Sequence, residues 1–155
     1  PIYFLQACLK YMNKGSRIIH VGSMAGDLTI PYQSFYSMSK AALDKFSEAL
    51  SMELYEKGIK VTTVLPGDTK TEFTKNRKKN ILKEEEKVNH SISKMEKDEQ
   101  KGASPHQVSK VIYRVMKRKH PPIRVAVGFP YRLFLFLERI LPRKAILFFI
   151  RKLYR

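Results

Sequence analysis

The chain lacks several residue types on which common kinds of site are built. It contains one cysteine, Cys8, and no tryptophan among its 155 residues. A single cysteine excludes an intramolecular disulfide framework and most cysteine-based metal sites, so Cys8 is expected to be a small buried apolar residue. The four histidines are scattered along the sequence rather than spaced as converging ligands, and no metal site is predicted.

Long hydrophobic segments are also missing. The longest uncharged apolar runs cover residues 133–137 and 145–150, far short of the roughly 18 residues that a membrane-spanning helix needs. No signal-peptide pattern stands at the start of the sequence. With the single cysteine, these features are typical of a reducing compartment, and we expect a cytoplasmic protein, with association to a membrane surface left open.

Acidic residues are scarce, with 14 Asp and Glu against 30 Lys and Arg, a net charge of +16. The excess is uneven, because residues 1–70 carry +2 whereas 71–120 and 121–155 carry +7 each. Basic clusters supply phosphate contacts, but zinc-finger spacing and RNP-like aromatic motifs are absent, so no specific nucleic-acid partner is predicted. A solvated charged face and attraction to an anionic membrane surface are the alternatives.

The apolar pattern predicts short buried strands alternating with helices. The strands are expected at 17–21, 59–65 and 123–127, and the helices at 2–12, 35–57, 106–119 and from 129 onward, interrupted at Pro142. Ser34 and Ser104 are expected to cap the helices that follow them. Residues 71–103 are rich in Lys and Glu and are expected to form an exposed helical insertion or mobile lid. Alternating strands and helices favour parallel βαβ units.

A tyrosine stands four residues before a lysine in the second predicted helix. Tyr36 and Lys40 would share one helix face, and an ammonium beside a phenol lowers the phenol pKa from about 10, which suits a general acid or base. Composition gives about one such pair by chance. A second pair, Tyr113 and Lys117, lies in a basic helix with no serine-bearing loop before it, and we interpret it as packing and surface charge.

The sequence around Tyr36 separates the two pairs. Ser23 follows the first predicted strand, and Pro66-Gly67 ends the second. Loops at the carboxyl ends of parallel strands form the ligand crevice of open α/β sheets. The serine, the Tyr36–Lys40 helix and the Pro-Gly loop are therefore expected to face one crevice.

At these residues the sequence resembles the short-chain dehydrogenase/reductase family, over about 15–73 and more loosely over the whole chain. Segments 22–32 and 35–43, which read GSMAGDLTIPY and FYSMSKAAL, are most similar to the branch of 17β-hydroxysteroid and retinol dehydrogenases. The resemblance implies that Tyr36 donates or accepts the proton, that Lys40 lowers its pKa and binds the nicotinamide ribose, and that Ser23 holds the substrate oxygen. The implied residues flanking the nicotinamide of NAD or NADP are Pro66, Gly67, Thr69 and Thr71.

The sequence departs from the family in its cofactor-binding half. The Gly-rich turn that binds the pyrophosphate at a helix N-terminus is absent, as are the family's Asn-Asn-Ala-Gly segment and helix asparagine. Three strands are few for a parallel sheet, and Pro1 precedes what looks like mid-helix. We therefore expect the C-terminal half of a Rossmann-like doubly wound sheet, with the N-terminal cofactor-binding half missing. The choice between NAD and NADP is made in that half and stays open.

The expected organisation is a partial Rossmann-like catalytic domain at 1–128, which includes the lid, followed by amphipathic helices at 129–155. The predicted function of the intact protein is NAD(P)-dependent interconversion of an alcohol and a ketone, acting on a lipophilic substrate. The resemblance also implies a homo-oligomer. The alternative is a non-catalytic basic module on a degenerate dehydrogenase scaffold that binds membrane or nucleic acid, and the intact Ser23, Tyr36 and Lys40 argue against it.

The C-terminal segment allows two interpretations. Its apolar residues recur at helical spacing on both sides of Pro142, while most of its Lys and Arg fall elsewhere. One interpretation is a helix that covers the sheet and the substrate pocket. The other is an interfacial helix lying on a membrane, apolar on one side and cationic on the other.

Overall fold

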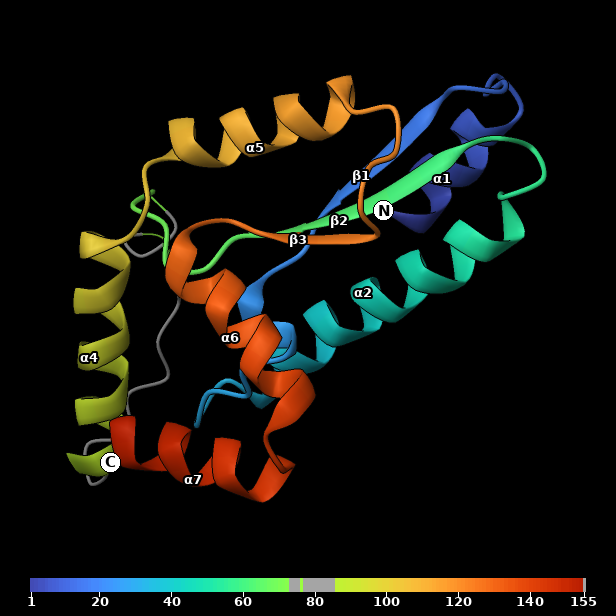
Figure 1. Ribbon diagram of the computed structural model, residues 1–155. Coiled ribbons are helices and arrows are strands. Elements are labelled where there is room, and N and C mark those ends of the chain that lie inside the picture. Colours follow the sequence, from blue (N-terminus) through green and yellow to red (C-terminus); the bar gives the residue numbers. More distant parts are fainter. Residues whose placement is uncertain (73–75, 77–85, 155) are drawn as a thin grey trace.

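The computed structural model describes residues 1–72, 76 and 86–154, and its elements form a sheet with helices on both sides (Figure 1). The strands are β1 (Arg17–Val21), β2 (Lys60–Leu65) and β3 (Arg124–Ala126). The helices are α1 (Ile2–Leu9), the short 3-10 helix η1 (Met24–Gly26), α2 (Ser34–Glu53), α4 (Glu86–Lys101), α5 (Pro105–Lys117), α6 (Phe129–Ile140) and α7 (Arg143–Leu153). All three predicted strands are present.

The strands form one parallel sheet in the order β1-β2-β3. Its register pairs Ile19 with Thr62 and Val64 with Val125. The central strand β2 is almost completely buried, with Val64 at 0% and Leu65 at 1% exposure, as expected for a parallel strand covered on both faces. The predicted α/β class with a parallel sheet is confirmed.

Two apolar clusters cover the opposite faces of the sheet. On one face Val61 packs with residues of α1, α2 and β1, namely Leu5, Ile18, Leu50 and Leu54. On the other face Val64 packs against Val111 and Val115 of α5. Val61 and Val64 are an odd number of residues apart, so alternation along β2 sends them to opposite faces. Figure 1 shows α5 above the sheet and α2 below it, and α1 packs into the same cluster as α2.

The helix boundaries confirm one predicted cap and overturn the other. Ser104 caps α5: its Oγ accepts from the Gln107 N–H at 3.4 Å, and its own N–H donates to Gln107 Oε1 at 3.1 Å. The prediction that Ser34 caps α2 is wrong, because Ser34 is already the first helical residue and Gln33 precedes it without a side-chain cap. Cys8 was expected to be buried, but the structure leaves it partly exposed.

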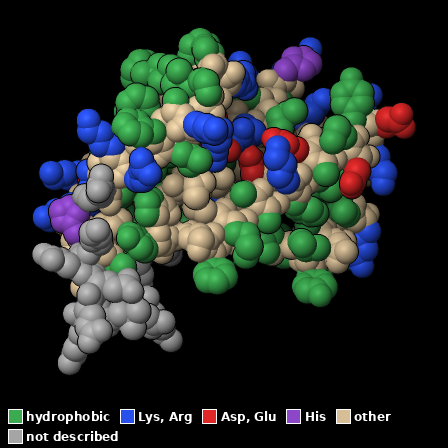
Figure 2. Space-filling model, turned by 90° about the horizontal axis from the view of Figure 1, so that it is seen from below, with side chains coloured by type: hydrophobic (Ala, Val, Ile, Leu, Met, Phe, Trp, Pro, Cys, Tyr) green, Lys and Arg blue, Asp and Glu red, His purple; other side chains and the backbone are tan. Residues whose placement is uncertain are grey.

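Each of the two C-terminal helices buries one side, and α6 does so against the sheet. Phe134 and Leu135 of α6 contact a cluster of Met24, Leu65 and Ala126, and α7 buries Ile146 and Ile150. Seen from below, Lys and Arg side chains spread over the molecule; the largest group of hydrophobic side chains lies at the upper left, and others are scattered along the lower edge and the right side (Figure 2). In the described part of the chain, no helix is both long and apolar enough to cross a membrane.

The predicted insertion at 71–103 is described only in part. Residues 73–75 and 77–85 lie outside the described residues. The described remainder contains α4, whose Ser91 and Met95 are buried. This helix therefore turns one side toward the rest of the protein.

Candidate active site

A cavity of about 1050 Å³ lies where the strands end. Its lining includes the residues that directly follow β1 and β2, and Tyr131 in the first turn of α6 after β3. The wall also includes the loop before α2, residues of α2 and α5, α4 residues such as Val88 and Ile92, and Ile150 and Leu153 of α7. The cavity thus occupies the carboxyl edge of the sheet, where ligand crevices of open α/β sheets lie.

Every site residue named from the sequence lines this cavity. These residues are Ser23, Tyr36, Lys40, Pro66, Gly67, Thr69 and Thr71. They come from three separate segments of the chain, and the fold of the parallel sheet brings them together. The second pair is elsewhere: Tyr113 is 57% exposed on α5 and is not part of this wall.

Tyr36 and Lys40 lie one helical turn apart in α2. The Lys40 Nζ sits 5.7 Å from the centroid of the Tyr36 ring and donates to the Val21 carbonyl at 3.4 Å. Lys40 is therefore held between the phenol and the last residue of β1. Partial burial lowers the pKa of its ammonium below the ordinary lysine value, because burial disfavours the charged form.

Ser23 is fixed by backbone contacts at the end of β1. Its Oγ accepts from the Ala25 N–H at 3.1 Å, which starts η1. The next residue, Met24, donates its N–H to the Pro66 carbonyl at 2.8 Å, so the loops after β1 and β2 are joined. A hydroxyl that accepts in this way keeps its own proton for donation to a ligand oxygen.

The Pro66–Thr69 loop is shaped by contact with Tyr131. A β-carbon at Gly67 would overlap the Tyr131 ring, so the close packing requires glycine here. The Tyr131 hydroxyl accepts from the Asp68 N–H at 2.9 Å and donates to Asp68 Oδ2 at 2.6 Å. Beyond it, Thr69 Oγ1 donates to the Gly67 carbonyl at 3.0 Å. The loop is thereby fixed from the side of α6.

The segment before α5 fixes the same loop from its other side. Ala103 donates its N–H to the Asp68 carbonyl at 2.8 Å and accepts from the Lys70 N–H at 2.9 Å. Gly102 lies against the Asp68 and Thr69 backbone so closely that a β-carbon there would overlap it. The end of α4 is therefore attached directly to the Pro66–Thr69 loop.

The cavity has a polar end built of acids and phenols. Burial raises the pKa of Asp68, and the hydrogen bond from Tyr131 opposes that rise. Burial also raises the pKa of Tyr131, and it raises that of Tyr154 to about 12. Asp98 and Glu99 of α4 add carboxylates to the same wall, where Lys40 is the basic member among the described lining residues.

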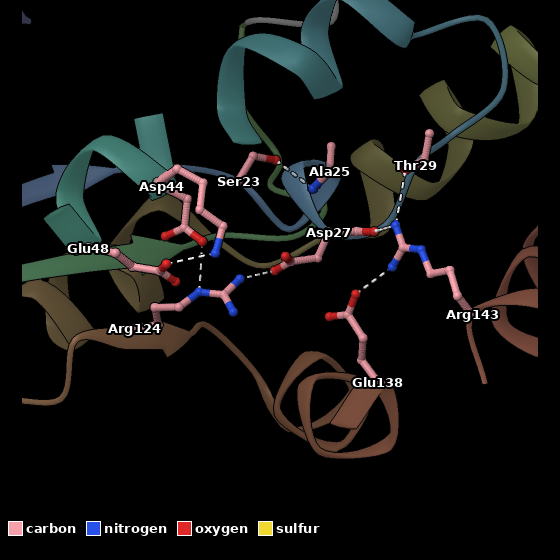
Figure 3. A network of polar contacts seen from close by, with 10 residues as sticks. Ser23, Ala25, Asp27, Thr29, Asp44, Glu48, Arg124, Glu138 and Arg143 are labelled. Carbon is pink, nitrogen blue, oxygen red and sulfur yellow. Dashed lines mark hydrogen bonds and ion pairs between the residues drawn. The ribbon is translucent and has the colours of Figure 1, made fainter. Parts of the chain in front are cut away.

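An ion-pair network supports the Ser23 loop from behind (Figure 3). Arg124 of β3 pairs with Asp27 in the loop and, at 2.8 Å between Nε and Oδ2, with the buried Asp44 of α2. Burial raises the pKa of Asp44 and Arg124 opposes that rise. Arg143 of α7 donates to the Asp27 carbonyl at 3.0 Å and pairs with Glu138 at 2.5 Å. Loop, sheet and C-terminal helices are thus tied together.

Sequence reasoning missed several residues of this site. Asp68 directly follows the Pro-Gly pair, and that position was a usable signal. No sequence signal marked Tyr131, Tyr154 or Asp98, because the spacing of apolar residues in a helix does not say whether that helix faces the cavity.

Among the described residues, the metal-ligand types form no cluster. His20 Nδ1 lies 2.7 Å from Ser47 Oγ, and burial lowers its pKa. Within residues 1–72, 76 and 86–154, no group of three or more His, Cys, Asp or Glu side chains is arranged to hold a metal ion.

Comparison with known proteins identifies relatives of matching fold. The family model described as short chain dehydrogenase matches residues 1–82. A 3-ketodihydrosphingosine reductase from Bacteroides thetaiotaomicron is 40% identical over 130 residues, which is 79% of this chain and 48% of that protein. The chain thus spans about half the length of this curated relative.

Solved structures agree with this assignment. A short-chain dehydrogenase from Streptomyces avermitilis has a TM-score of 0.64 and 27% identity, covering 90% of this chain and 51% of its own. A serine dehydrogenase in its closed form, complexed with NADP+, has a TM-score of 0.54 and 26% identity, covering 71% of this chain and 42% of its own. The match over residues 1–82 covers more than half of the sequence, and on this basis the chain belongs to the short chain dehydrogenase family.

Proposed function

We propose that the protein is an NAD(P)-dependent oxidoreductase that interconverts an alcohol and a ketone, with Tyr36 as general acid and base. The observation that carries the proposal is the convergence of Ser23, Tyr36 and Lys40 on one cavity at the carboxyl edge of the sheet. The three residues belong to two different segments, and each is held by contacts of the fold. Their chemical types match a proton transfer to or from a substrate oxygen.

The proposed roles are those that the family resemblance implies for these three side chains. Tyr36 gives its proton to the carbonyl oxygen during reduction and takes a proton from the hydroxyl during oxidation. The Lys40 ammonium, 5.7 Å from the ring centroid, favours the phenolate form that appears when the proton leaves. Ser23 donates a hydrogen bond to the same substrate oxygen and orients it.

The residues present fit the nicotinamide end of the cofactor. NAD or NADP supplies the hydride when bound. Lys40 is proposed to bind its ribose hydroxyls, and Pro66, Gly67, Thr69 and Thr71, which line the same cavity, are proposed to adjoin the nicotinamide. The Gly67 backbone in this wall is held by the Tyr131 ring, which packs where a side chain at that position would lie. A serine dehydrogenase with the same fold is complexed with NADP+, which supports this class of cofactor.

The substrate is proposed to be lipophilic. The cavity is lined by apolar side chains of α4, α6 and α7, including Ile92, Met95, Ile150 and Leu153. The relative from Bacteroides thetaiotaomicron is named for 3-ketodihydrosphingosine, a long-chain ketone. The sequence resemblance to 17β-hydroxysteroid and retinol dehydrogenases agrees with the same substrate class, and a place in that branch remains a proposal.

Isotope transfer tests the proposed reaction. The full-length protein is incubated with NADH or NADPH deuterated at C4, together with a panel of long-chain and steroid ketones. We expect deuterium on the carbinol carbon of at least one product by mass spectrometry. A folded protein that binds the dinucleotide but transfers no deuterium to any ketone would instead favour the non-catalytic module on a dehydrogenase scaffold.

A further inference from the structure

Helix α6 presents an apolar stripe to the outside of the molecule. Phe129, Leu133, Phe136, Leu137 and Ile140 recur at helical spacing, and their exposures run from 37% to 75%. The opposite side of α6, with Tyr131 and Phe134, faces the cavity and the core. Amphipathic helices of globular proteins turn their apolar side inward, so an outward stripe of this length marks an interaction surface.

Arginines flank this stripe. Arg132 and Arg139 lie on the exposed side of α6, and with Arg124 they line a hollow of about 220 Å³ that also includes Phe136. Arg124 is paired with Asp27 and Asp44, whereas Arg132 contacts the Ala126 carbonyl at 3.4 Å. A cationic hollow beside exposed apolar side chains fits a ligand with a negative head and a hydrocarbon body.

Helix α7 also exposes apolar side chains beside a basic one, and it reaches the cavity. It buries Ile146 and Ile150, but exposes Phe148 at 52% and Phe149 at 61%. The Arg151 guanidinium lies 5.9 Å from the Phe148 ring centroid. Leu153 is 56% exposed and also lines the cavity, so α7 extends from the outer surface to the cavity rim.

We propose that the outward face of α6, meaning Phe129, Leu133, Phe136, Leu137 and Ile140 with Arg132 and Arg139, docks on the surface of an anionic lipid bilayer. The apolar stripe inserts at the interface and the arginines meet the lipid phosphates. Residues 121–155 carry a net charge of +7, which complements such a surface. The two interpretations of the C-terminal segment then both apply, to opposite sides of the same helices.

A second copy of the chain fits this surface less well. A two-fold contact places the same patch of each copy against its partner. Such a contact would bring the arginines of both copies into one patch, and like charges brought together oppose association. The charge of the patch therefore favours a lipid surface over self-association.

Vesicle flotation of the full-length protein tests the proposal. Neutral phosphatidylcholine vesicles are compared with vesicles containing phosphatidylserine, at low and high salt. We expect binding to the anionic vesicles that weakens with salt, because the Debye length falls from about 10 Å at 0.1 M to about 3 Å at 1 M. Absence of binding to anionic vesicles at low salt would overturn the proposal.

Paired variants locate the surface. F136S/I140S removes the apolar contact and R132Q/R139Q removes two charges, and neither pair lines the catalytic cavity. At about 1 kcal/mol for each basic residue, the loss of two charges should weaken partitioning about 30-fold. The matched controls are Y113S/M116S, which replaces side chains on α5 that are 57% and 53% exposed, and K110Q/K117Q on the same helix.

Each outcome decides the question. Reduced binding of both α6 variants, with binding of both controls and the melting temperature unchanged, supports the proposal. Unchanged binding of the α6 variants overturns it, and so does a F136S/I140S variant that alters the oligomer size in light scattering but not vesicle binding. Flotation does not depend on turnover, so failure here is distinguishable from failure of the proposed oxidoreductase function.

Discussion

The hydroxyl of Tyr131 makes two hydrogen bonds with Asp68: it accepts from the backbone N–H at 2.9 Å and donates to the carboxylate at 2.6 Å. The two residues are 63 positions apart in the sequence. Through this contact the first turn of α6 determines the shape of the loop that follows β2. The Pro66–Thr69 loop contains three of the residues proposed to adjoin the cofactor, so Tyr131 acts as a positioning residue.

Tyr131→Phe should weaken this loop while leaving the fold intact. The ring that packs on Gly67 is kept, whereas both hydrogen bonds to Asp68 are lost, at a cost of about 1–2 kcal/mol in the free energy of unfolding. We expect a raised KM for the dinucleotide, measured by steady-state kinetics of the full-length protein. Tyr113→Phe is the control, since Tyr113 lies on the exposed side of α5. An unchanged KM for the cofactor would contradict the positioning role.

Asp68 should make stability fall as the pH rises. Burial raises its pKa in the folded protein above the ordinary value of 3.8, so in this window the folded state binds more protons than the unfolded state. Stability is therefore highest below the ordinary pKa and decreases as the pH rises through the folded-state value. The free energy of unfolding of the wild type minus that of Asp68→Asn, measured by denaturant titration from pH 3 to pH 8, should decrease as the pH rises. A pH-independent difference would contradict this assignment.

Tyr36→Phe should abolish turnover of the full-length protein while the dinucleotide still binds. The phenol supplies the proton, but it is one of several residues around the cofactor. Removal of a general acid typically costs 10²–10⁴-fold in rate. Tyr113→Phe is again the matched control, because Lys117 lies 5.2 Å from the Tyr113 ring centroid in a pair of the same spacing. Equal kcat for wild type and Tyr36→Phe would remove Tyr36 from the mechanism.

Lys40→Ala should lose both turnover and dinucleotide affinity. Its ammonium lies beside the Tyr36 ring and is also proposed to bind the nicotinamide ribose. Isothermal titration with NADH and NADPH, alongside kinetics, measures the two effects separately. Normal dinucleotide affinity in this variant would show that Lys40 does not bind the cofactor.

Arg124→Met should destabilise the protein by about 3 kcal/mol. The substitution leaves Asp27 and the buried Asp44 without their shared cation, and uncompensated buried charge is costly. Lys45→Gln is the comparison, since the Lys45–Glu48 pair is largely exposed and such pairs contribute less than about 1 kcal/mol. Urea denaturation of both variants gives the two values. Similar losses in both would mean that the Arg124 network contributes no more than a surface pair.

Helix α4 should exchange its amide hydrogens faster than β2 and should slow on binding of substrate. It lines the cavity but has few buried side chains, whereas β2 is buried along nearly its whole length. Sparse packing lowers the free energy of local opening. Hydrogen exchange with mass spectrometry, with and without a bound ketone, measures this. Equal protection of residues 86–101 and 60–65 would refute the prediction of a lid in this part of the chain.

The sequence alone determined the elements and the candidate chemistry. Short β-branched runs bounded by Gly and Pro predicted all three strands, since hydrophobic periodicity and turn residues act locally. Ser23, Tyr36, Lys40 and the Pro66-Gly67 pair were named from their positions after strands and on one helix face. Local signals were weaker at helix ends, where Ser34 was placed one residue outside its helix.

The tertiary structure decided which residues that lie far apart in the sequence come into contact, and local sequence signals do not contain this information. Tyr131 reaches Asp68 and Arg124 reaches Asp44 across long stretches of sequence, because the parallel crossovers bring β3 and α6 beside β2. It also decided which side of α6 faces outward, since an amphipathic pattern specifies two faces but not what each contacts. Spacing is a property of neighbouring residues, whereas the packing partner of a helix depends on the path of the whole chain.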